Sequence, residues 1–214
     1  RSLEVLDAPP QVSWAAWAQA CNRDYRDNID PANGGVVLPG TIDMPALVAT
    51  LFEHLPPAAI LTNGAGNFAS WLHRFYRYRG LARGHKTQLA PTNGAMGYGV
   101  PAGVGAAITQ PQRTVFTIAG DGDFLMNGQE LATAAQHGAK TIVLLLNNGM
   151  YGTIRMHQEK HYPARLSGSH LENPDFCALA RAYGYAAERV THTAEFEPAL
   201  LRALAAPTGT LIEL

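Results

Sequence analysis

Two apolar runs, each followed by glycines and oxygen-bearing side chains, constrain the fold of this chain most. Thr114–Ile118 precedes the tripeptide Gly-Asp-Gly at residues 120–122, and Thr141–Leu146 precedes Asn-Asn-Gly at residues 147–149. Short, nearly continuous apolar runs bounded by turn residues are typical of parallel strands that are buried on both faces. Both runs are therefore predicted to be strands with polar loops at their carboxyl ends.

A helix is predicted between these two strands. Residues Phe124–His137 have a helical composition, and Gly138 supplies a stop signal. A strand, a helix and a second strand form a β-α-β unit, in which both strands end at the same edge of the sheet. Asp121 and Asn148 are thereby expected to meet at the carboxyl edge, where open α/β sheets bind ligands.

The side chains at this edge favour a hard cation. Asp121 offers a carboxylate and Asn148 an amide oxygen. Mg²⁺ is commonly held by a few such oxygens together with phosphate and water. Gly120 and Gly122 flank Asp121, so the backbone can approach a ligand closely and present its amides to an anion. The pattern predicts a magnesium-bridged diphosphate site.

Ordinary turn chemistry is the alternative explanation of the two loops. Asp-Gly is a common turn, and Asn-Gly is the commonest signal of a hairpin. A hairpin does not account for Asn148-Gly149, because residues Met150–Met156 have the character of a beginning helix rather than of a returning strand. Taken together, the two loops favour a binding site.

The segment that contains both loops resembles the diphosphate-binding motif of thiamine diphosphate-dependent enzymes. It reads GDGDFLMNGQELATAAQHGAKTIVLLLNNGMYG from Gly120 to Gly152. Within that superfamily it is similar to the branch that holds acetolactate synthases, benzoylformate decarboxylases and related 2-oxo-acid enzymes. The similarity extends upstream through Pro91–Ala102, and the matching segments span residues 58 to 160.

The resemblance implies how the cofactor is held. The side chains of Asp121 and Asn148 and the carbonyl of Met150 are expected to bind Mg²⁺. The backbone amides of Gly122 and Asp123 are expected to meet the diphosphate. Asp123 departs from the family pattern, because many relatives carry Ser there. An acid beside a diphosphate is expected to point away from it, or to reach the metal through water.

Further cofactor contacts follow from the same resemblance. Met96 matches the bulky apolar residue that supports the bent conformation of the cofactor, with a core methionine as the plain alternative. Gly66 and Asn67 match the loop that touches the diphosphate from the other side, although Asn63 and Asn67 equally fit Asx turns. The other residues expected around the cofactor are Gly94, Ala95, Gly120, Tyr151, Gly152 and Thr153.

The substrate pocket is expected near Ile154 and His157. Biosynthetic acetolactate synthases carry a Trp at the position of His157, where it shapes the pocket for the second substrate. The His departs from that pattern and favours a 2-oxo-acid decarboxylase or carboligase of another specificity. Ile154 is expected near the cofactor ring, with simple burial under its helix as the alternative.

The resemblance also implies the reaction and the partners. A small-molecule 2-oxo acid loses carbon dioxide and is then protonated or joined to a second acceptor, and thiamine diphosphate supplies the nucleophilic carbon. In the family, the activating glutamate belongs to a pyrimidine-binding domain, normally on another subunit of a homodimer or homotetramer. No such domain fits in these 214 residues, so the chain alone is expected to be inactive.

Composition narrows the classes of function. Charged residues make up 15% of the chain and its net charge is −1, so neither nucleic acid nor a membrane surface is an expected partner. No apolar run approaches the length of a membrane span, and no signal peptide is visible. Cys21 and Cys177 do not make a disulfide framework, which favours a reducing cytoplasm.

Two parts of the chain are distinguished. Residues 1–40 are interpreted as a linker and connecting helix from an upstream domain, and residues 41–214 as the diphosphate-binding domain. The first part holds an expected helix around Trp14–Arg26 and a Pro/Gly-rich loop at residues 30–35. The chain begins with Arg1 and ends within an apolar run, so a fragment of a longer protein is expected.

The second part alternates strands and helices. Strands are expected near residues 58, 114, 141, 186 and 210. Further helices are expected from an Asp43 cap to Leu55, over Gly97–Thr109, from Pro174 to Gly184, and from a Thr193 cap to Ala205. This order predicts an open, mainly parallel α/β sheet of five or six strands with helices on both faces.

Other patterns indicate competing functions. Gly97–Ala102 matches a dinucleotide fingerprint and raises an NAD-binding Rossmann dehydrogenase domain as an alternative, but residues 90–94 before it resemble a loop instead of the required strand. His157–His161 resembles a zinc-protease helix, but its Glu lies one place too late to serve as the metal-activated base. Arg74–Arg79 is better explained as a solvated or subunit-facing helix than as an RNA site. A non-catalytic assembly domain is a further alternative, against which the retained metal-ligand residues argue.

Overall fold

The computed structural model describes residues 12–30, 40–80 and 86–214. Its contacts divide the chain into two compact units, Arg1–Val37 and Leu38–Leu214, which are described separately here.

The described part of the first unit is a single helix. This helix, α1 (Ala15–Ile29), carries no buried side chain. The helix expected around Trp14–Arg26 is present, whereas most of the loop expected at residues 30–35 lies outside the described residues. The role of residues 1–40 as a connecting segment stays a prediction.

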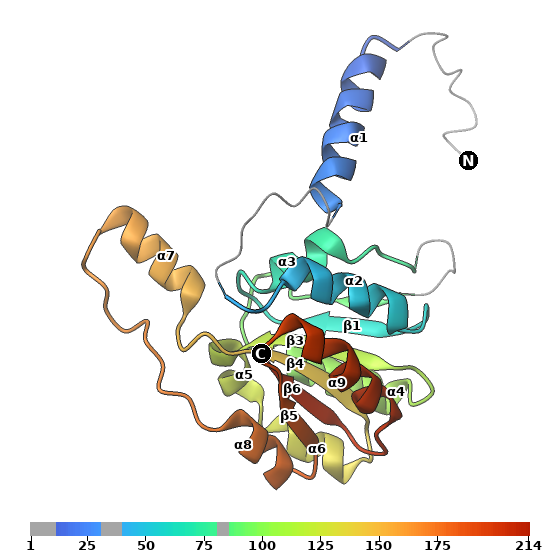
Figure 1. Ribbon diagram of the computed structural model, residues 1–214, viewed down its shortest axis with the longest axis vertical. Helices are drawn as coiled ribbons and strands as arrows, with labels where there is room; N and C mark the ends of the chain where they lie inside the picture. The colour runs from blue at the N-terminus through green and yellow to red at the C-terminus, as the bar shows by residue number, and fades with distance from the viewer. Residues whose placement is uncertain (1–11, 31–39, 81–85) are drawn as a thin grey trace. The chain divides into compact units, whose positions relative to one another are not determined.

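Six strands form one sheet in the described part of the second unit, in the order β2-β1-β3-β4-β6-β5 (Figure 1). Every neighbouring pair is parallel. The prediction of an open, parallel α/β sheet is confirmed. The strands are β1 (Ile60–Asn63), β2 (Gln88–Leu89), β3 (Val115–Gly120), β4 (Thr141–Leu146), β5 (Ala186–Arg189) and β6 (Thr210–Glu213).

Helices cover both faces of this sheet (Figure 1). Among the described helices, none is long and apolar enough to cross a membrane. The helices of the second unit are α2 (Met44–His54), α3 (Ala69–Phe75), α4 (Gly99–Thr109), α5 (Asp121–Asn127), α6 (Glu130–Gln136), α7 (Gly152–His161), α8 (Phe176–Ala182) and α9 (Thr193–Ala205).

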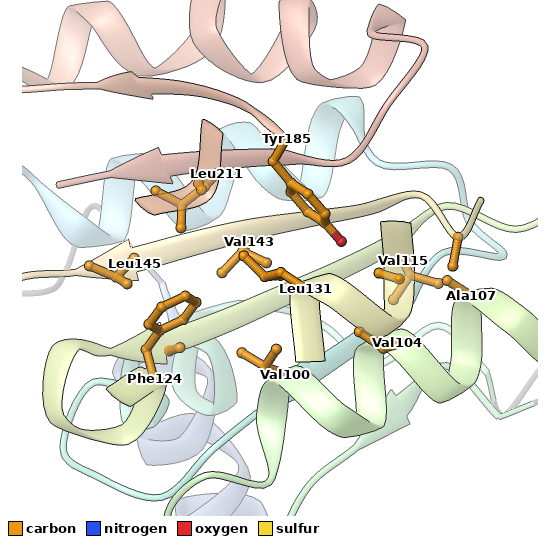
Figure 2. Packing of buried hydrophobic residues seen from close by; sticks show 14 of the residues in the cluster. Val100, Val104, Ala107, Val115, Phe124, Leu131, Val143, Leu145, Tyr185 and Leu211 are labelled. Atoms are coloured by element: carbon orange, nitrogen blue, oxygen red, sulfur yellow. The ribbon is translucent and has the colours of Figure 1, made fainter. Parts of the chain in front are cut away.

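Alternate residues of the central strands build two separate cores. On β4, Val143 and Leu145 join the core that includes α4, α5, α6 and α8, which Figure 2 shows. Ile142 and Leu144 join the other core, which includes α2, α3 and α9. Side chains alternate between the two faces of a strand, so a strand that is apolar throughout is buried on both sides. The sequence of this strand is continuously apolar because its alternate residues lie in these two cores.

The prediction of one helix over Phe124–His137 is wrong. The structure has α5 and α6 instead, and the first of them begins three residues earlier, at Asp121. At the break, the amide of Leu131 bonds to the Gly128 carbonyl at 3.1 Å, which is the tighter i→i+3 pattern. A Cβ on Gly128 would lie 2.5 Å from the Phe124 ring, so the chain turns where the ring packs against bare backbone.

Three helix starts can be compared with the predictions. Asp43 caps α2, as predicted, by accepting a bond from the Ala46 amide at 3.1 Å. Helix α8 begins at Phe176, two residues after the predicted start at Pro174, and the carboxylate of its cap, Asp175, accepts from the Ala178 amide at 3.0 Å. The cap of α9 is His192 in place of Thr193, because Glu195 reaches back to the His192 amide in a capping box.

A strand that was not predicted lies before the dinucleotide-like sequence. Strand β2 pairs with β1 through Gln88 and Leu89 alone. Residues 90–94, which were predicted to be a loop, follow this strand. Residues 90–98 nevertheless separate β2 from α4, so the tight strand–turn–helix that a dinucleotide fingerprint requires is absent from this described segment.

Candidate cofactor site

The site is built where β3 and β4 end side by side. These strands pair in parallel register, and Gly120, the last residue of β3, lies opposite Leu146, the last of β4. The chain therefore leaves both strands at one edge, with Asp121 next along one and Asn147 next along the other. The predicted meeting of the two polar loops at the carboxyl edge follows directly from this register.

Asp121 lies at the centre of the edge and is 3% exposed. Its Oδ1 accepts from the Gly122 amide at 2.9 Å. Its Oδ2 accepts from the Gly149 amide at 2.8 Å and from the Asn173 side chain at 2.7 Å. Each carboxylate oxygen has about two acceptor positions. These bonds therefore leave one position on Oδ1 for a cation.

Asn148 and Met150 form a tight turn beside Asp121. The Asn148 Oδ1 accepts from the Met150 amide at 3.2 Å, and the Met150 carbonyl accepts from the Gly152 amide at 3.0 Å. The first bond is the Asx-type pattern of ordinary turn chemistry. Each oxygen keeps a second lone pair, so both can still bind a metal. Gly149 between them has φ +67°, which favours glycine.

A cavity of about 470 Å³ opens at this edge. Fourteen of the predicted site residues line it, and among the predicted residues Ala95 and His157 do not. The lining residues that were predicted are Gly66, Asn67, Gly94, Met96, Gly120, Asp121, Gly122, Asp123, Asn148, Met150, Tyr151, Gly152, Thr153 and Ile154. The lining residues that were missed are Ala65, Phe68, Trp71 and Leu146.

Glycines let the loops around the cavity pack closely. A Cβ on Gly122 would lie 2.4 Å from Cε1 of Tyr151, and one on Gly120 would lie 2.9 Å from Cδ1 of Phe68. Each ring packs directly against the backbone of a glycine. The glycine-rich loops thus bring backbone amides and aromatic rings to the wall of one cavity, a shape that fits an anionic group.

Asp123 is buried and ties the upstream loops to the edge. Its Oδ1 accepts from the amides of Gly97 at 2.8 Å and Ala65 at 3.2 Å. Its Oδ2 is buried without a hydrogen bond from the described part of the chain. Burial raises the pKa of this carboxyl to about 6, although the two amides oppose the shift. The Asp123 side chain therefore connects two loops to the first turn of α5.

The loop after β1 contacts the beginning of α7. The Asn67 amide donates to Oγ1 of Thr153 at 3.1 Å, and its side chain lies 3.7 Å from the Met156 sulfur. Asn63, by contrast, is buried at the end of β1, where its Oδ1 lies 3.0 Å from Nε2 of His73. The two asparagines that were both candidate Asx residues thus have different surroundings, and only Asn67 lines the cavity.

The two substrate-pocket candidates on α7 are both exposed. Ile154 lines the cavity and is 47% exposed, so burial under its own helix does not describe it. His157 is exposed and its ring stacks near that of His161, with centroids 6.4 Å apart. Its place in a substrate pocket stays a prediction.

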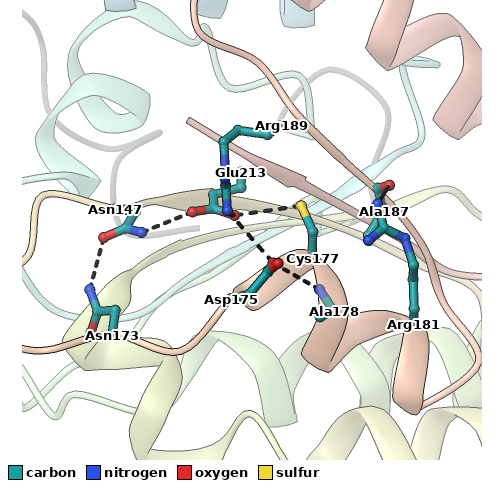
Figure 3. Close-up of polar contacts among 9 residues, drawn as sticks. All are labelled: Asn147, Asn173, Asp175, Cys177, Ala178, Arg181, Ala187, Arg189 and Glu213. Carbon is teal, nitrogen blue, oxygen red and sulfur yellow. Dashed lines mark hydrogen bonds and ion pairs between the residues drawn. The ribbon is translucent and has the colours of Figure 1, made fainter.

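A second group of potential metal ligands lies near the ends of β5 and β6. Ligand atoms of Asp175, Cys177 and Glu213 lie within 4.8 Å of one another. Arg189, however, bonds to Glu213 at 3.0 Å (Figure 3) and supplies the positive charge there. Burial, followed by the Glu213 charge, raises the pKa of the Cys177 thiol to about 11, which disfavours the thiolate that metals bind. The group is an ion-pair cluster.

An all-parallel α/β sheet with a glycine-lined, oxygen-rich cavity at its carboxyl edge is typical of domains that bind phosphorylated cofactors. Residues 64–214 match the family described as "Thiamine pyrophosphate enzyme, C-terminal TPP binding domain". The chain belongs to this family of cofactor-binding domains, and it is similar to acetolactate synthases and to a related decarboxylase.

Three relatives define the neighbourhood of the chain. It is 35% identical to an acetolactate synthase large subunit of Parasynechococcus marenigrum, over 100% of this chain and 33% of that protein. It is 37% identical to the Corynebacterium glutamicum acetolactate synthase large subunit, over 89% and 30%. The structure of a Rhodococcus jostii thiamine diphosphate-dependent 4-hydroxybenzoylformate decarboxylase superposes with a TM-score of 0.71 at 30% identity, over 84% and 33%. The chain spans about a third of the length of these relatives.

Proposed function

We propose that the protein is a thiamine diphosphate- and Mg²⁺-dependent enzyme that acts on a 2-oxo acid as a decarboxylase or carboligase. One observation supports this most strongly. Asp121 and Asn148 leave adjacent parallel strands and line the same cavity, and the amide of Gly149 bonds to Asp121 at 2.8 Å. A carboxylate and an amide oxygen held together in this way form a hard-ligand pair.

In this proposal each residue has a distinct task. Asp121, Asn148 and the Met150 carbonyl would hold Mg²⁺, which would neutralise the charge of the diphosphate. The backbone around Gly122 would hold the diphosphate, and Met96 would support the cofactor from the cavity wall. The bound cofactor supplies the nucleophilic carbon and the electron sink for decarboxylation. The protein orients it and excludes water from the buried end, where Asp121 and Asp123 are each 3% exposed.

The proposal includes partners that the chain itself does not contain. A pyrimidine-binding domain, on the same or another subunit of a homodimer or homotetramer, supplies the activating glutamate. Both cysteines of the chain are free, which supports a reducing cytoplasm as the compartment. The names of the relatives support acetolactate synthase-like carboligation or decarboxylation of an aryl 2-oxo acid. His157 and Ile154 are the proposed substrate contacts that distinguish these activities.

Calorimetric titration of thiamine diphosphate into the full-length protein tests the proposal. Asp121→Asn retains the shape of the side chain and removes its charge. We expect native protein to bind thiamine diphosphate only when Mg²⁺ is present, and Asp121→Asn to lose most of this Mg²⁺-dependent binding. Affinity that is unchanged by Asp121→Asn would contradict the metal assignment. A panel of 2-oxo acids with and without a second aldehyde or oxo-acid acceptor then separates decarboxylase from carboligase.

The same titration addresses the alternatives. Tight NADH binding without a response to thiamine diphosphate would instead favour a dehydrogenase. Binding of neither cofactor would favour an assembly domain that retains the fold.

A further inference from the structure

We propose that Asn173 is a positioning residue that fixes the carboxylate of Asp121 for the metal. This inference rests on the proposed function, because it needs Asp121 to be a metal ligand. Asn173 lies 52 positions after Asp121, in the segment between α7 and α8. Its Nδ2 donates to Asp121 Oδ2 at 2.7 Å and to Asn147 Oδ1 at 2.8 Å.

These two bonds define the orientation of the Asn173 amide. The opposite orientation would place its oxygen against a carboxylate oxygen and a carbonyl oxygen at once, and both contacts would be repulsive. In the observed orientation the Asn173 Oδ1 is buried and makes no hydrogen bond with the described residues. Burial of an unpaired oxygen opposes folding. The side chain therefore satisfies Asp121 and Asn147 at the expense of its own oxygen.

Asn173 is the last link of a polar chain that starts at Arg189. Arg189 bonds to Glu213 at 3.0 Å, and Glu213 accepts from the Asn147 side chain at 2.9 Å. Asn147 in turn accepts from Asn173, as Figure 3 shows. Glu213 is 3% exposed, so its own position is fixed by burial as well as by these bonds. This series of hydrogen bonds runs across the ends of β6 and β4 and reaches Asp121 at the end of β3.

The backbone before Asn173 is paired with the loop that carries the other proposed ligands. The Tyr151 amide donates to the Ser169 carbonyl at 2.9 Å, and the Leu171 amide donates to the Gly149 carbonyl at 2.8 Å. Met150 and His170 form an isolated antiparallel bridge between these bonds. One short segment thus holds the Asn148–Met150 loop through its backbone and Asp121 through a side chain.

The consequence is an unequal use of the two Asp121 oxygens. Oδ2 accepts two bonds and Oδ1 accepts one. With Asn173 on Oδ2, the free acceptor position lies on Oδ1, and the cation is expected there. Partners that orient a metal ligand typically change metal affinity by about 10- to 100-fold when they are removed.

Metal titration of the full-length protein tests the assignment. Mn²⁺ replaces Mg²⁺ as the probe, and free Mn²⁺ is followed by electron paramagnetic resonance with thiamine diphosphate present. For Asn173→Ala we expect Mn²⁺ to bind about 10- to 100-fold more weakly. Asn173→Asp, which has the same shape but faces Asp121 with an acceptor, is expected to lose at least as much affinity. Glu172→Gln, an exposed neighbour, is the matched control and is expected to remain within about twofold.

The outcomes separate this inference from the proposed function. Asn173→Ala or Asn173→Asp that folds and binds Mn²⁺ as native protein does, while Asp121→Asn loses binding, would overturn the role of Asn173 alone. Unchanged binding by Asp121→Asn would overturn both. A purely structural role for Asn173 predicts a lower unfolding midpoint with native Mn²⁺ affinity, so a urea titration of each variant accompanies the metal titration. If Asn173→Ala does not fold, Asn173→Asp alone decides.

Discussion

Among single residues, Cys177 shows how a side chain loses its usual chemistry through its surroundings. It is buried on α8, and its thiol lies 3.5 Å from a carboxylate oxygen of Glu213. Both burial and the negative charge disfavour the thiolate, so the pKa of the thiol is raised to about 11. Cys21 on α1 is exposed. The two free cysteines of the chain therefore have opposite accessibility.

We predict that iodoacetamide modifies Cys21 but not Cys177 in the folded protein at pH 8. With a pKa of about 11, only about 0.1% of the Cys177 thiol is ionised at that pH. Isotope-coded alkylation before and after unfolding, read by mass spectrometry of the two peptides, measures this. Equal labelling of both peptides before unfolding would contradict it.

The same pKa shift makes the stability of the folded protein depend on pH. The folded protein holds the Cys177 proton more tightly than the unfolded chain does, because the ordinary pKa of a cysteine thiol is 9.0. The stabilising contribution is therefore complete below about pH 9 and is lost as the pH rises towards 11.

The proposed metal site shows which residues a sequence can reveal. Asp121 and Asn148 could be predicted because each lies beside a glycine at the end of a recognisable strand. Asn173 could not, because Asn173-Pro174 has the local character of a turn and its partner lies 52 positions away. Phe68 and Trp71 were missed for a related reason. Aromatic residues in a short helix indicate a core, and only the packing of Phe68 over Gly120 brings them to the cavity.

At the scale of elements, a glycine allows α4 to pack closely against the sheet. A Cβ on Gly103 would lie 2.3 Å from Oγ1 of Thr117 and 3.2 Å from Oγ1 of Thr62. Those two hydroxyls are 2.7 Å apart, and Thr62 also donates to the Gly99 carbonyl at 2.8 Å. A side chain at Gly103 would therefore push the helix away from a buried hydrogen-bonded pair.

We predict that Gly103→Ala lowers the free energy of unfolding by about 1–3 kcal/mol, the usual cost of overpacking. Gly105→Ala is the matched control in the same helix, because a Cβ there meets nothing within 4 Å. Since Ala has the higher helix propensity, Gly105→Ala is expected to stabilise by about 0.5–1 kcal/mol. Urea unfolding of both variants measures the difference. Similar effects of the two substitutions would show that α4 does not pack as described.

The elements that were predicted well are those with strong local signals. Strands β3 and β4 have long apolar runs, and Asp43 is a strong helix cap. Strand β2 was missed because two residues carry no periodicity, and its pairing with β1 creates it. The break between α5 and α6 was missed because Gly128 is compatible with a helix in isolation, and it is the Phe124 ring that determines the turn.

For the whole molecule, cofactor and metal are expected to act as one ligand. A ligand that binds only the folded state raises the free energy of unfolding, by about 2.7 kcal/mol at one hundred times its dissociation constant. In the proposed site Asp121 and the diphosphate would both bind the cation. Neither the cofactor nor the metal is therefore expected to bind well alone.

We predict that thiamine diphosphate raises the melting temperature of the full-length protein only with Mg²⁺, and that EDTA reverses the increase. Thiamine, which lacks the diphosphate, is the matched control and is expected to give no increase with Mg²⁺. Differential scanning calorimetry measures each combination. An increase with thiamine diphosphate in EDTA would mean that the diphosphate is held without a metal.

The parallel direction of the six described strands has a practical consequence. The residues assigned to the cofactor follow the ends of β1, β2, β3 and β4, so they lie away from the rim of the sheet where the strands begin. The exposed turn at residues 110–112 leads into β3 on that opposite rim. An immobilisation tag attached there would anchor the protein to a support with the cavity facing outward.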